Sequence, residues 1–397
     1  MKITKVEAIP ITMPGYEGVT SRGVWSTIYT YVRITTDEGI VGIGSGGFAK
    51  AMSYGETQGT VMEVIHNVIG PELLGEDPLN IGRLVHKMDR AICWNWIAKT
   101  GVDNALHDIV GKALGVPVYT LLGGRAREKL PVGRYLPALE SLEDTKKVEA
   151  NIKLAVDSIK AGLHSLTFKV GLSDPEVDVE YFRLVREAVG PNVLMLVDAN
   201  QAWDPVTAIR TIRKLDKYDL FAAESPVPEW DIEGLAKVHR AVDAFIIADE
   251  VARSTEGAVN IIKAGAADMF KLHTAKAGGL FKSRQYVTIA EAANMPVLVG
   301  VMGGAGLEHA ADAHFGVAIE WVGKIPANTN VGPLRVFGVL DTLSIEREHK
   351  DLIKGYARIE KGFVYPPEGP GLGVELDEEK VRKCLTPGKQ ILVCEKK

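Results

Sequence analysis

Three acidic side chains follow three apolar segments of the chain at nearly equal intervals. Asp198 ends the segment VLMLVD, Glu224 ends DLFAAE and Asp249 ends AFIIAD. The acids are 26 and 25 residues apart, and a further 24 residues lead to His273. Because an unpaired carboxylate at the end of a buried strand is costly, these acids need a compensating charge. One such acid is often only a helix N-cap, but three in register indicate a cation site.

Polar and cationic side chains lie on the segments on either side of these acids. Lys169 ends the segment SLTFK before the first acid, and Thr167, two residues earlier, points to the same side of that strand. In KLHTAKAGG, after the third acid, Lys271 and His273 share one face and Lys276 precedes two glycines. A lysine on one side of a metal and a histidine on the other suit proton transfer at a carbon next to a carboxylate.

The acids predict a magnesium site, and the cations around it have more than one possible role. Ligation by carboxylate oxygens alone favours Mg²⁺, which keeps positions open for water and substrate. Lys169 is interpreted as a general base; the alternatives are a surface lysine or the Schiff-base lysine of an aldolase-type barrel, which would not need three acids. His273 is either a second acid/base or a structural or substrate-binding histidine. Lys276 is a substrate-carboxylate or loop-structuring residue.

The elements that position these residues alternate regularly. Apolar runs that resemble buried parallel strands are separated by helical segments such as DPVTAIRTIRKL and DIEGLAKVHRAV. The runs are SLTFKVG, VLMLVDA, DLFAAE, AFIIADE, DMFKLH, PVLVGV and VAIEW. Seven or eight such units of about 25 residues predict an α/β fold of the (β/α)8 TIM-barrel type, with the strand ends side by side at one mouth. An open doubly wound sheet would normally show a glycine-rich nucleotide turn after VGRYLPALES, and none is present.

The remaining segments predict a capping domain. STIYTYVRIT and IVGIGSGG flank the polar segment TDEG, which indicates a β-hairpin, and residues 53–122 have helical periodicity. Strands followed by helices indicate an α+β unit. We therefore predict an N-terminal capping domain at 1–127, the barrel at 128–353, and a C-terminal segment at 354–397 that returns to the cap.

Composition excludes several classes of protein. The 397 residues are 46% hydrophobic and 24% charged with a net charge of −5, which is typical of a globular protein with a large core. No basic stripe indicates binding to nucleic acid or to an anionic membrane surface. Three cysteines without metal-ligand spacing, no signal segment and no apolar run near the roughly 18 residues of a membrane span predict a soluble, cytoplasmic protein.

These motifs resemble the enolase superfamily and, within it, the mandelate racemase/muconate lactonizing enzyme group. The resemblance rests on NALHDIVGKALGVPVYTLLGG, VDANQAW, AAESPVP, IIADE and GPGLGVELD, and it covers essentially the whole chain. It implies an α+β cap, a (β/α)7β barrel, and Mg²⁺ on Asp198, Glu224 and Asp249. It also implies abstraction of the proton next to the carboxylate of a small acid substrate, and a homo-oligomer.

The sequence departs from the family pattern in its acid/base residues. The group has Lys-x-Lys where this chain has Thr167-Phe168-Lys169, members similar to muconate lactonizing enzyme have a lysine at His273, and VLVGVMGG lacks the histidine of members similar to mandelate racemase. The leading hypothesis is an isomerase, a racemase, epimerase or cycloisomerase, with Lys169 and His273 on opposite faces of the substrate. One alternative is a hydroxy-acid dehydratase in which His273 or Lys271 protonates the departing hydroxyl. The other is a non-catalytic carboxylate-binding barrel.

Six residues are predicted to bind the substrate. Trp25 lies in MPGYEGVTSRGVW, a glycine-rich segment predicted to be a loop that could act as a lid, and Glu320 lies beside Trp321 near the final strand region. Tyr135 ends the first barrel strand. The complete set is Thr167, Asn200, Lys276, Tyr135, Trp25 and Glu320.

Overall fold

The barrel strands form one parallel sheet in the order of the sequence. The computed structural model describes residues 1–20, 23–48, 55–300, 306–324, 340–341 and 352–396. The parallel strands are β4 (Leu130–Leu136), β5 (Ser165–Lys169), β6 (Leu194–Asp198), β7 (Ala222–Glu224), β8 (Phe245–Ala248), β9 (Met269–Leu272) and β10 (Val297–Val299). A further short strand, β11 (Leu340–Asp341), pairs with β4 in parallel. Six of the seven predicted runs, from SLTFKVG to PVLVGV, are therefore confirmed as strands.

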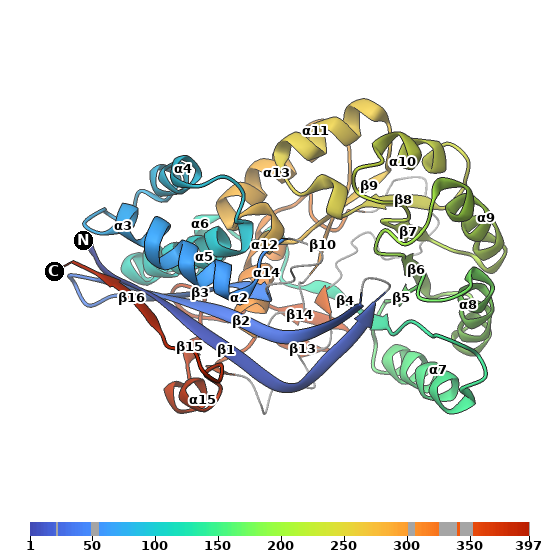
Figure 1. Cartoon of the computed structure of the whole chain (residues 1–397), viewed down its shortest axis with the longest axis horizontal. Helices are drawn as coiled ribbons and strands as arrows, with labels where there is room; N and C mark the ends of the chain where they lie inside the picture. The colour runs from blue at the N-terminus through green and yellow to red at the C-terminus, as the bar shows by residue number, and fades with distance from the viewer. Residues whose placement is uncertain (21–22, 49–54, 301–305, 325–339, 342–351, 397) are drawn as a thin grey trace.

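Helices follow the strands and lie outside the sheet (Figure 1). They are α7 (Thr145–Lys160), α8 (Pro175–Val189), α9 (Pro205–Leu215), α10 (Ile232–His239), α11 (Thr255–Ala264), α13 (Leu280–Ala292) and α14 (Gly306–Ala318). Several begin at an acidic or serine N-cap whose side chain accepts a backbone N–H, as at Asp204 and Ser254. Such caps satisfy donors that the first helical turn leaves free, which explains why these helices start where they do.

A small apolar cluster fills the barrel interior below its mouth. Its members are buried and come from successive strands: Leu196, Ala222, Ile247, Met269 and Leu298. Neighbouring members are in register, since Leu196 lies opposite Ala222 and Ile247 opposite Met269. The cluster closes the lower part of the barrel, so that chemistry is confined to the ends of the strands.

The prediction that VAIEW is a barrel strand was wrong. Val317 and Ala318 are the last residues of α14, a buried helix rich in alanine, which has the highest helix propensity. Beyond the helix, Val322 forms an isolated bridge with Val297. The place next to β4 is taken instead by β11, twenty-odd residues further along the chain. A short apolar run at a helix end has the same pattern as a buried strand, which explains the error.

The cap is built on an antiparallel sheet of four strands in the order β16–β1–β2–β3. These strands are β1 (Ile3–Thr20), β2 (Gly23–Thr36), β3 (Val41–Phe48) and β16 (Leu392–Glu395). The predicted hairpin around TDEG is confirmed by the pairing of β2 with β3. The helical region contains α2 (Gln58–Glu63), η1 (Val64–Ile69), α3 (Gly70–Leu73), α4 (Ile81–Ala91), α5 (Trp96–Leu114) and α6 (Val118–Leu121). None of the described helices is long and apolar enough to cross a lipid bilayer.

Alternate glycines on β3 allow α5 to pack directly on the sheet. A Cβ at Gly42, Gly44 or Gly46 would lie 2.2, 2.1 or 2.0 Å from a backbone oxygen of α5. These distances are far below van der Waals contact, and backbone atoms of a helix cannot move aside easily. The alternation of glycine in VGIGSGG therefore places one bare face of a strand against a helix that is buried along most of its length.

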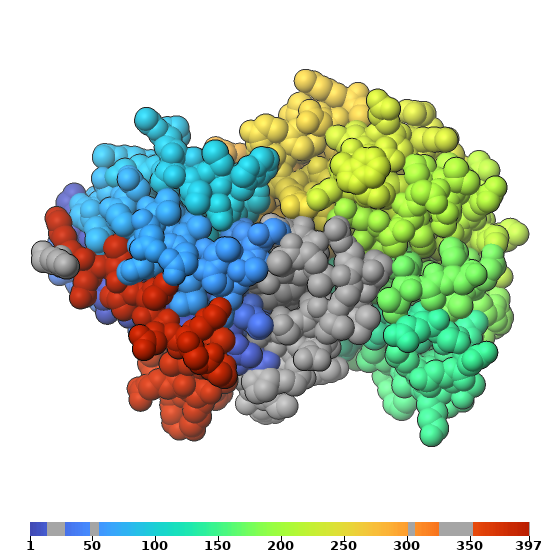
Figure 2. Space-filling view, in the orientation of Figure 1, coloured from blue at the N-terminus to red at the C-terminus, as the bar shows by residue number. Residues whose placement is uncertain are grey.

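The C-terminal segment contacts both the barrel and the cap. The hairpin of β13 (Arg358–Glu360) and β14 (Phe363–Tyr365) pairs with the start of β4. After β15 (Glu375–Leu376) and α15 (Glu378–Lys383), β16 adds to the cap sheet beside β1. In Figure 2 this segment, coloured red, lies against the blue N-terminal part of the chain. The domain boundaries themselves stay predictions.

A single buried carboxylate joins three parts of the cap. Asp108 of α5 accepts hydrogen bonds from the backbone N–H of Ile43 on β3 at 2.9 Å and of Leu372 in the C-terminal segment at 2.8 Å. Lys112 donates a third hydrogen bond at 2.6 Å. Burial raises the pKa of Asp108, although the charge of Lys112 acts in the opposite direction.

Replacing Asp108 with alanine is therefore expected to lower the free energy of unfolding by about 3 kcal/mol, because two buried N–H groups and an ammonium lose their acceptor. Urea denaturation measures this loss. The control is Asp157→Ala, which removes an exposed ion pair with Lys153 on α7 and is expected to change the free energy of unfolding far less. Equal effects of the two substitutions would contradict the joining role of Asp108.

Candidate active site

The three predicted acids lie together at the C-terminal edge of the barrel sheet. Asp198 and Glu224 are the last residues of β6 and β7 and lie opposite each other in the register. Asp249 comes directly after β8. Their exposed fractions are only 1%, 2% and 3%. The strand periodicity thus buries three carboxylates at one mouth, as the sequence analysis predicts.

A nearby lysine balances the negative charge of each of the first two acids. Lys169, at the end of β5, lies opposite Asp198 in the register and donates a hydrogen bond to its Oδ2. Lys271 of β9 crosses toward the middle acid, and its Nζ lies 3.4 Å from Glu224 Oε2. The Lys271 side chain is completely buried.

The third acid has two cationic neighbours. Lys276 lies on α12 (Thr274–Ala277), a short helix that follows β9, and it donates to Asp249 Oδ1 and, at 2.7 Å, to the Asp249 backbone oxygen. His273 Nε2 lies 3.5 Å from Asp249 Oδ2. Lys169 and Lys276 therefore hold the two outer acids of the row in the same way, from opposite sides.

Burial and mutual repulsion shift the pKa values of these groups strongly. Burial raises the pKa of Glu224 to about 8; Lys271 opposes this shift, and the negative charges of Asp198 and Asp249 add to it. Burial also acts to raise the pKa of Asp249, but Lys276 and His273 outweigh it and hold that pKa well below its usual range. The three acids therefore lie in unlike environments, and the charged form of the middle one is the least favoured.

The pKa values of Lys169 and His273 shift in opposite directions. Burial acts to lower the pKa of Lys169, but the charges of Asp198, Tyr135 and Glu224 outweigh it, so that the pKa lies above its ordinary value. Burial lowers the pKa of His273 despite the nearby charge of Asp249. In this structure Lys169 is thus a proton donor, and the neutral form of His273 is favoured.

Two of the predicted substrate-binding residues lie beside the lysines. The ring of Tyr135 on β4 has Lys169 Nζ 4.7 Å and Lys271 Nζ 5.7 Å from its centroid, so that lysines from β5 and β9 converge on one aromatic ring. Thr167 is buried on β5, two residues below Lys169. Its hydroxyl has no hydrogen-bond partner within the described parts of the chain.

A second layer of polar groups lies behind the acids, and of its members only Asn200 was predicted, as a substrate-binding residue. Glu250, which is 2% exposed, accepts hydrogen bonds from Ser225 Oγ at 2.5 Å and from Asn200 Nδ2 at 3.3 Å. Asn200 also donates its backbone N–H to Asp198 Oδ1 at 2.8 Å. A signal was present, because Ser225 and Glu250 each directly follow one of the three acids in the sequence. This layer orients the acids, as outer-shell groups do at metal sites.

Two other predicted residues are not brought into this group. Glu320 is exposed, ion-paired with Lys324 at 3.4 Å, and its backbone oxygen accepts a hydrogen bond from Arg127. The neighbouring bridge between Val322 and Val297 places it at the N-terminal ends of the strands, opposite the mouth. Trp25 lies on β2, paired with Gly18, and its side chain falls outside the described residues.

The predicted loop around Trp25 is instead a β-hairpin. β1 continues to Thr20 and β2 starts at Gly23, and the two strands pair up to these residues with an irregularity between Thr12 and Glu17. The hairpin extends from the cap sheet toward the barrel (Figure 1). The glycines of MPGYEGVTSRGVW therefore lie within paired strands, where sequence alone indicated a turn.

The chemistry of the acids fits a divalent cation. As they stand, no three His, Cys, Asp or Glu side chains of the described residues are close enough together to hold a metal ion. Each acid is turned toward a cationic side chain instead. Glu224 Oε2 is nevertheless buried without a hydrogen-bond donor among the described residues. Three buried carboxylates on adjacent strand ends, one with an unsatisfied oxygen, form the oxygen donor set that Mg²⁺ prefers.

Comparison with known proteins accounts for most of the chain. Residues 4–123 match the family described as mandelate racemase / muconate lactonizing enzyme, N-terminal domain. Residues 151–380 match the family described as enolase C-terminal domain-like. The chain belongs to the mandelate racemase/muconate lactonizing enzyme group of the enolase superfamily. The family and the fold expected from the sequence are thereby confirmed.

Similar proteins of known activity in this group are isomerases. Muconate cycloisomerase 1 of Rhodococcus opacus is 31% identical over 382 residues, which cover 96% of each chain. N-succinyl-L-Arg/Lys racemase of Bacillus cereus is 31% identical over 387 residues, which cover 96% of this chain and 98% of the racemase. The crystal structure of a family protein from an Azoarcus species is 39% identical, with a TM-score of 0.88 over 99% of this chain and 100% of the other. These relatives confirm the predicted enzyme class, an isomerase.

Because Gly300 has no side chain, Lys271 and His273 can occupy the space beside it. Gly300 follows β10, and a Cβ at this position would lie 2.5 Å from Lys271 Cε and 2.6 Å from His273 Cε1. Both atoms belong to movable ends of side chains. The clash at Gly46, in contrast, is with the backbone oxygen of Ile97.

We therefore expect Gly300→Ala to lower the free energy of unfolding by less than about 1.5 kcal/mol, and Gly46→Ala to lower it by about 3 kcal/mol or more. Urea denaturation compares the two. A crystal structure of Gly300→Ala should show Lys271 displaced, with its Nζ to Glu224 Oε2 distance changed from 3.4 Å. An unmoved Lys271 would show that this glycine does not position the lysine.

Proposed function

We propose that the protein is a Mg²⁺-dependent isomerase that moves the proton on the carbon next to the carboxylate of a small acid substrate. The observation that carries this proposal is the row of three buried acids with a lysine hydrogen-bonded at each end. Lys169 reaches Asp198 from β5, and Lys276 reaches Asp249 from α12. A substrate carbon held between these two lysines would have a proton donor or acceptor on each face.

Asp198, Glu224 and Asp249 are the residues that would hold the metal ion. When bound, the ion supplies positive charge that offsets the negative charge developing on the substrate carboxylate as the adjacent proton leaves. Asn200, Ser225 and Glu250 orient the acids from behind, as described above. These roles are consistent with the raised pKa of Glu224, whose charged form burial and two like charges disfavour.

The lysines act as the acid and base. The hydrogen bond to Asp198 keeps Lys169 protonated in the present structure. A group that takes the Asp198 carboxylate away from Lys169 would therefore lower the pKa of Lys169 toward the range of a general base. Lys276 has the equivalent contact with Asp249. From the sequence, His273 was predicted to be this second acid/base, and it lies beside the same acid. Lys271 and Tyr135, which lie close to each other and to Glu224 and Lys169 respectively, would fix the substrate.

Each of the two lysines is expected to exchange the α-proton of a different enantiomer of the substrate. The probes are N-succinyl amino acids and dipeptides, the substrate classes of the racemase and epimerase relatives, incubated with enzyme and Mg²⁺ in D₂O. Lys169→Met should slow deuterium incorporation from one enantiomer by about 100-fold or more and leave exchange from the other, and Lys276→Met should do the reverse. NMR measures the loss of the α-proton signal.

His273→Asn tests the histidine in the same assay. Exchange of the α-proton of both enantiomers is expected to persist in this variant, since the imidazole Nε2 lies 3.5 Å from Asp249 Oδ2, whereas Lys276 is hydrogen-bonded to that acid. If His273→Asn instead loses deuterium exchange from one enantiomer and Lys276→Met retains it, His273 is the second base. Unchanged exchange in both lysine variants would contradict the proposed mechanism, and a 2-keto acid product would indicate dehydration.

Metal binding is expected to stabilise the fold. For protein first treated with a chelator, Mg²⁺ at 100 times its dissociation constant should raise the free energy of unfolding by about 2.7 kcal/mol. Thermal unfolding followed by calorimetry measures this increase. Asp249→Asn should lose most of it, and the surface variant Asp157→Asn should keep it. A wild-type protein that Mg²⁺ does not stabilise would contradict the metal site.

A further inference from the structure

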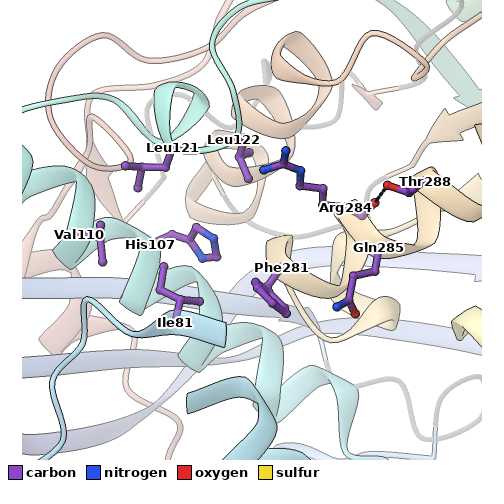
Figure 3. A pocket seen from close by; sticks show the side chains of 9 residues that line it. All are labelled: Ile81, His107, Val110, Leu121, Leu122, Phe281, Arg284, Gln285 and Thr288. Atoms are coloured by element: carbon purple, nitrogen blue, oxygen red, sulfur yellow. Dashed lines mark hydrogen bonds between the residues drawn. The ribbon is translucent and has the colours of Figure 1, made fainter. Parts of the chain in front are cut away.

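A cavity separate from the mouth lies between the cap and the outside of the barrel. It has a volume of about 490 Å³ and is bordered by α4, α5 and α6 of the cap and by α13 of the barrel (Figure 3). Its lining residues are Ile81, His107, Val110, Leu121, Leu122, Phe281, Arg284, Gln285 and Thr288. None of them belongs to the acid row or its cationic partners. The volume falls within the range of small-molecule sites in proteins.

The two sides of the cavity differ in chemistry. The cap side is apolar, with Ile81, Val110 and the pair Leu121–Leu122. The barrel side presents the polar side chains of Arg284, Gln285 and Thr288 from the exposed part of α13, with Phe281 one turn before them. A ligand that fits has an apolar body and one polar end.

A buried histidine projects into the cavity from the cap. The ring of His107 points toward Phe281 and is only 4% exposed (Figure 3). Its Nδ1 lies 2.9 Å from the backbone oxygen of Asp103 and 3.3 Å from Asp103 Oδ2, which leaves Nε2 for a ligand. Burial acts to lower the pKa of His107, but the charge and hydrogen bonds of Asp103 outweigh it and raise that pKa. When protonated, the ring donates from Nε2.

An arginine that has no ion pair with any described residue faces the same space. The Arg284 side chain extends from α13 toward Leu122 (Figure 3). Its backbone oxygen accepts from Thr288 Oγ1, but the described residues provide no carboxylate for its guanidinium. A planar guanidinium that is free of protein acids is suited to bind a carboxylate with two parallel hydrogen bonds.

We propose that this cavity is a second binding site, for a small monocarboxylate with an apolar body. The carboxylate pairs with the Arg284 guanidinium and accepts a hydrogen bond from His107 Nε2, and the apolar body packs against Ile81, Val110 and Leu122. The site is independent of the mouth and of the isomerase proposal, because its ligand touches neither the acids nor their lysines.

The contacts of Asp103 connect the cavity to the start of α13. Asp103 Oδ2 accepts the backbone N–H of Leu280 at 2.6 Å and of Phe281 at 3.3 Å, in addition to its contact with His107. Gly279 packs against the same carboxylate, since a Cβ there would lie 2.4 Å from Asp103 Oδ2. A ligand bound to His107 should therefore protect these two amides from exchange, which gives a readout specific to the cavity.

The test uses phenylbutyrate as the probe, with the uncharged phenylbutanol as its matched partner. Calorimetric titration of the full-length protein, treated with a chelator so that the mouth lacks metal, should show phenylbutyrate binding. Arg284→Gln should weaken its affinity tenfold or more, because a charge-assisted pair is lost, and phenylbutanol should bind both proteins weakly. Arg210→Gln, an exposed arginine on α9, is the matched control and should bind as wild type.

A second variant and a second readout locate the bound probe. Thr288→Trp, at an exposed position of the lining, should fill the cavity and abolish binding without loss of fold. Phenylbutyrate should slow hydrogen exchange of the Leu280 and Phe281 amides in wild type and not in Thr288→Trp. The proposal is overturned if phenylbutyrate does not bind, if Arg284→Gln and Thr288→Trp bind it as wild type does, or if protection appears only at the strand ends of the mouth.

Discussion

Burial of three like charges at neighbouring strand ends is the constraint on which the rest of the site depends. Asp198, Glu224 and Asp249 are almost fully buried, and in such surroundings the repulsion between carboxylates is much stronger than in water. The chain compensates them with cationic or titratable side chains from the flanking elements: Lys169, Lys271, His273 and Lys276. The contacts that neutralise the acids thus also place proton donors around the position where a substrate would bind.

Much of this arrangement could be predicted because it follows local periodicity. The repeat length of about 25 residues depends on one strand, one helix and two short connections, and it fixes which strand ends are neighbours. The side-chain alternation along a strand then places Thr167 and Lys169, or Lys271 and its neighbours, on one face. The acid row, the barrel strands β4 to β10 and the hairpin of β2 and β3 were all within reach of such reasoning.

The parts that escaped prediction depend on packing between distant segments. The pairing of Lys276 with Asp249 requires α12 to turn the chain back over the mouth, and nothing in TAKAGG specifies that direction. VAIEW has the same apolar pattern whether it ends a helix or forms a strand, and the assignment of Glu320 to the mouth depended on that choice. The position of Arg284 opposite His107 arises from the packing of the cap on α13, which no single segment encodes.

The pairing of the first strand with the last has a consequence for synthesis on the ribosome. Lys5 to Ala8 on β1 lie opposite Leu392 to Glu395 on β16, and the backbone N–H of Leu372 is held by α5. The repeated units of the barrel meet their neighbours soon after they emerge, but the cap sheet lacks its strand β16 until the chain has been made through Glu395. During that interval the outer edge of β1 is unpaired, and a chaperone that shields exposed strand edges would protect the nascent protein from aggregation.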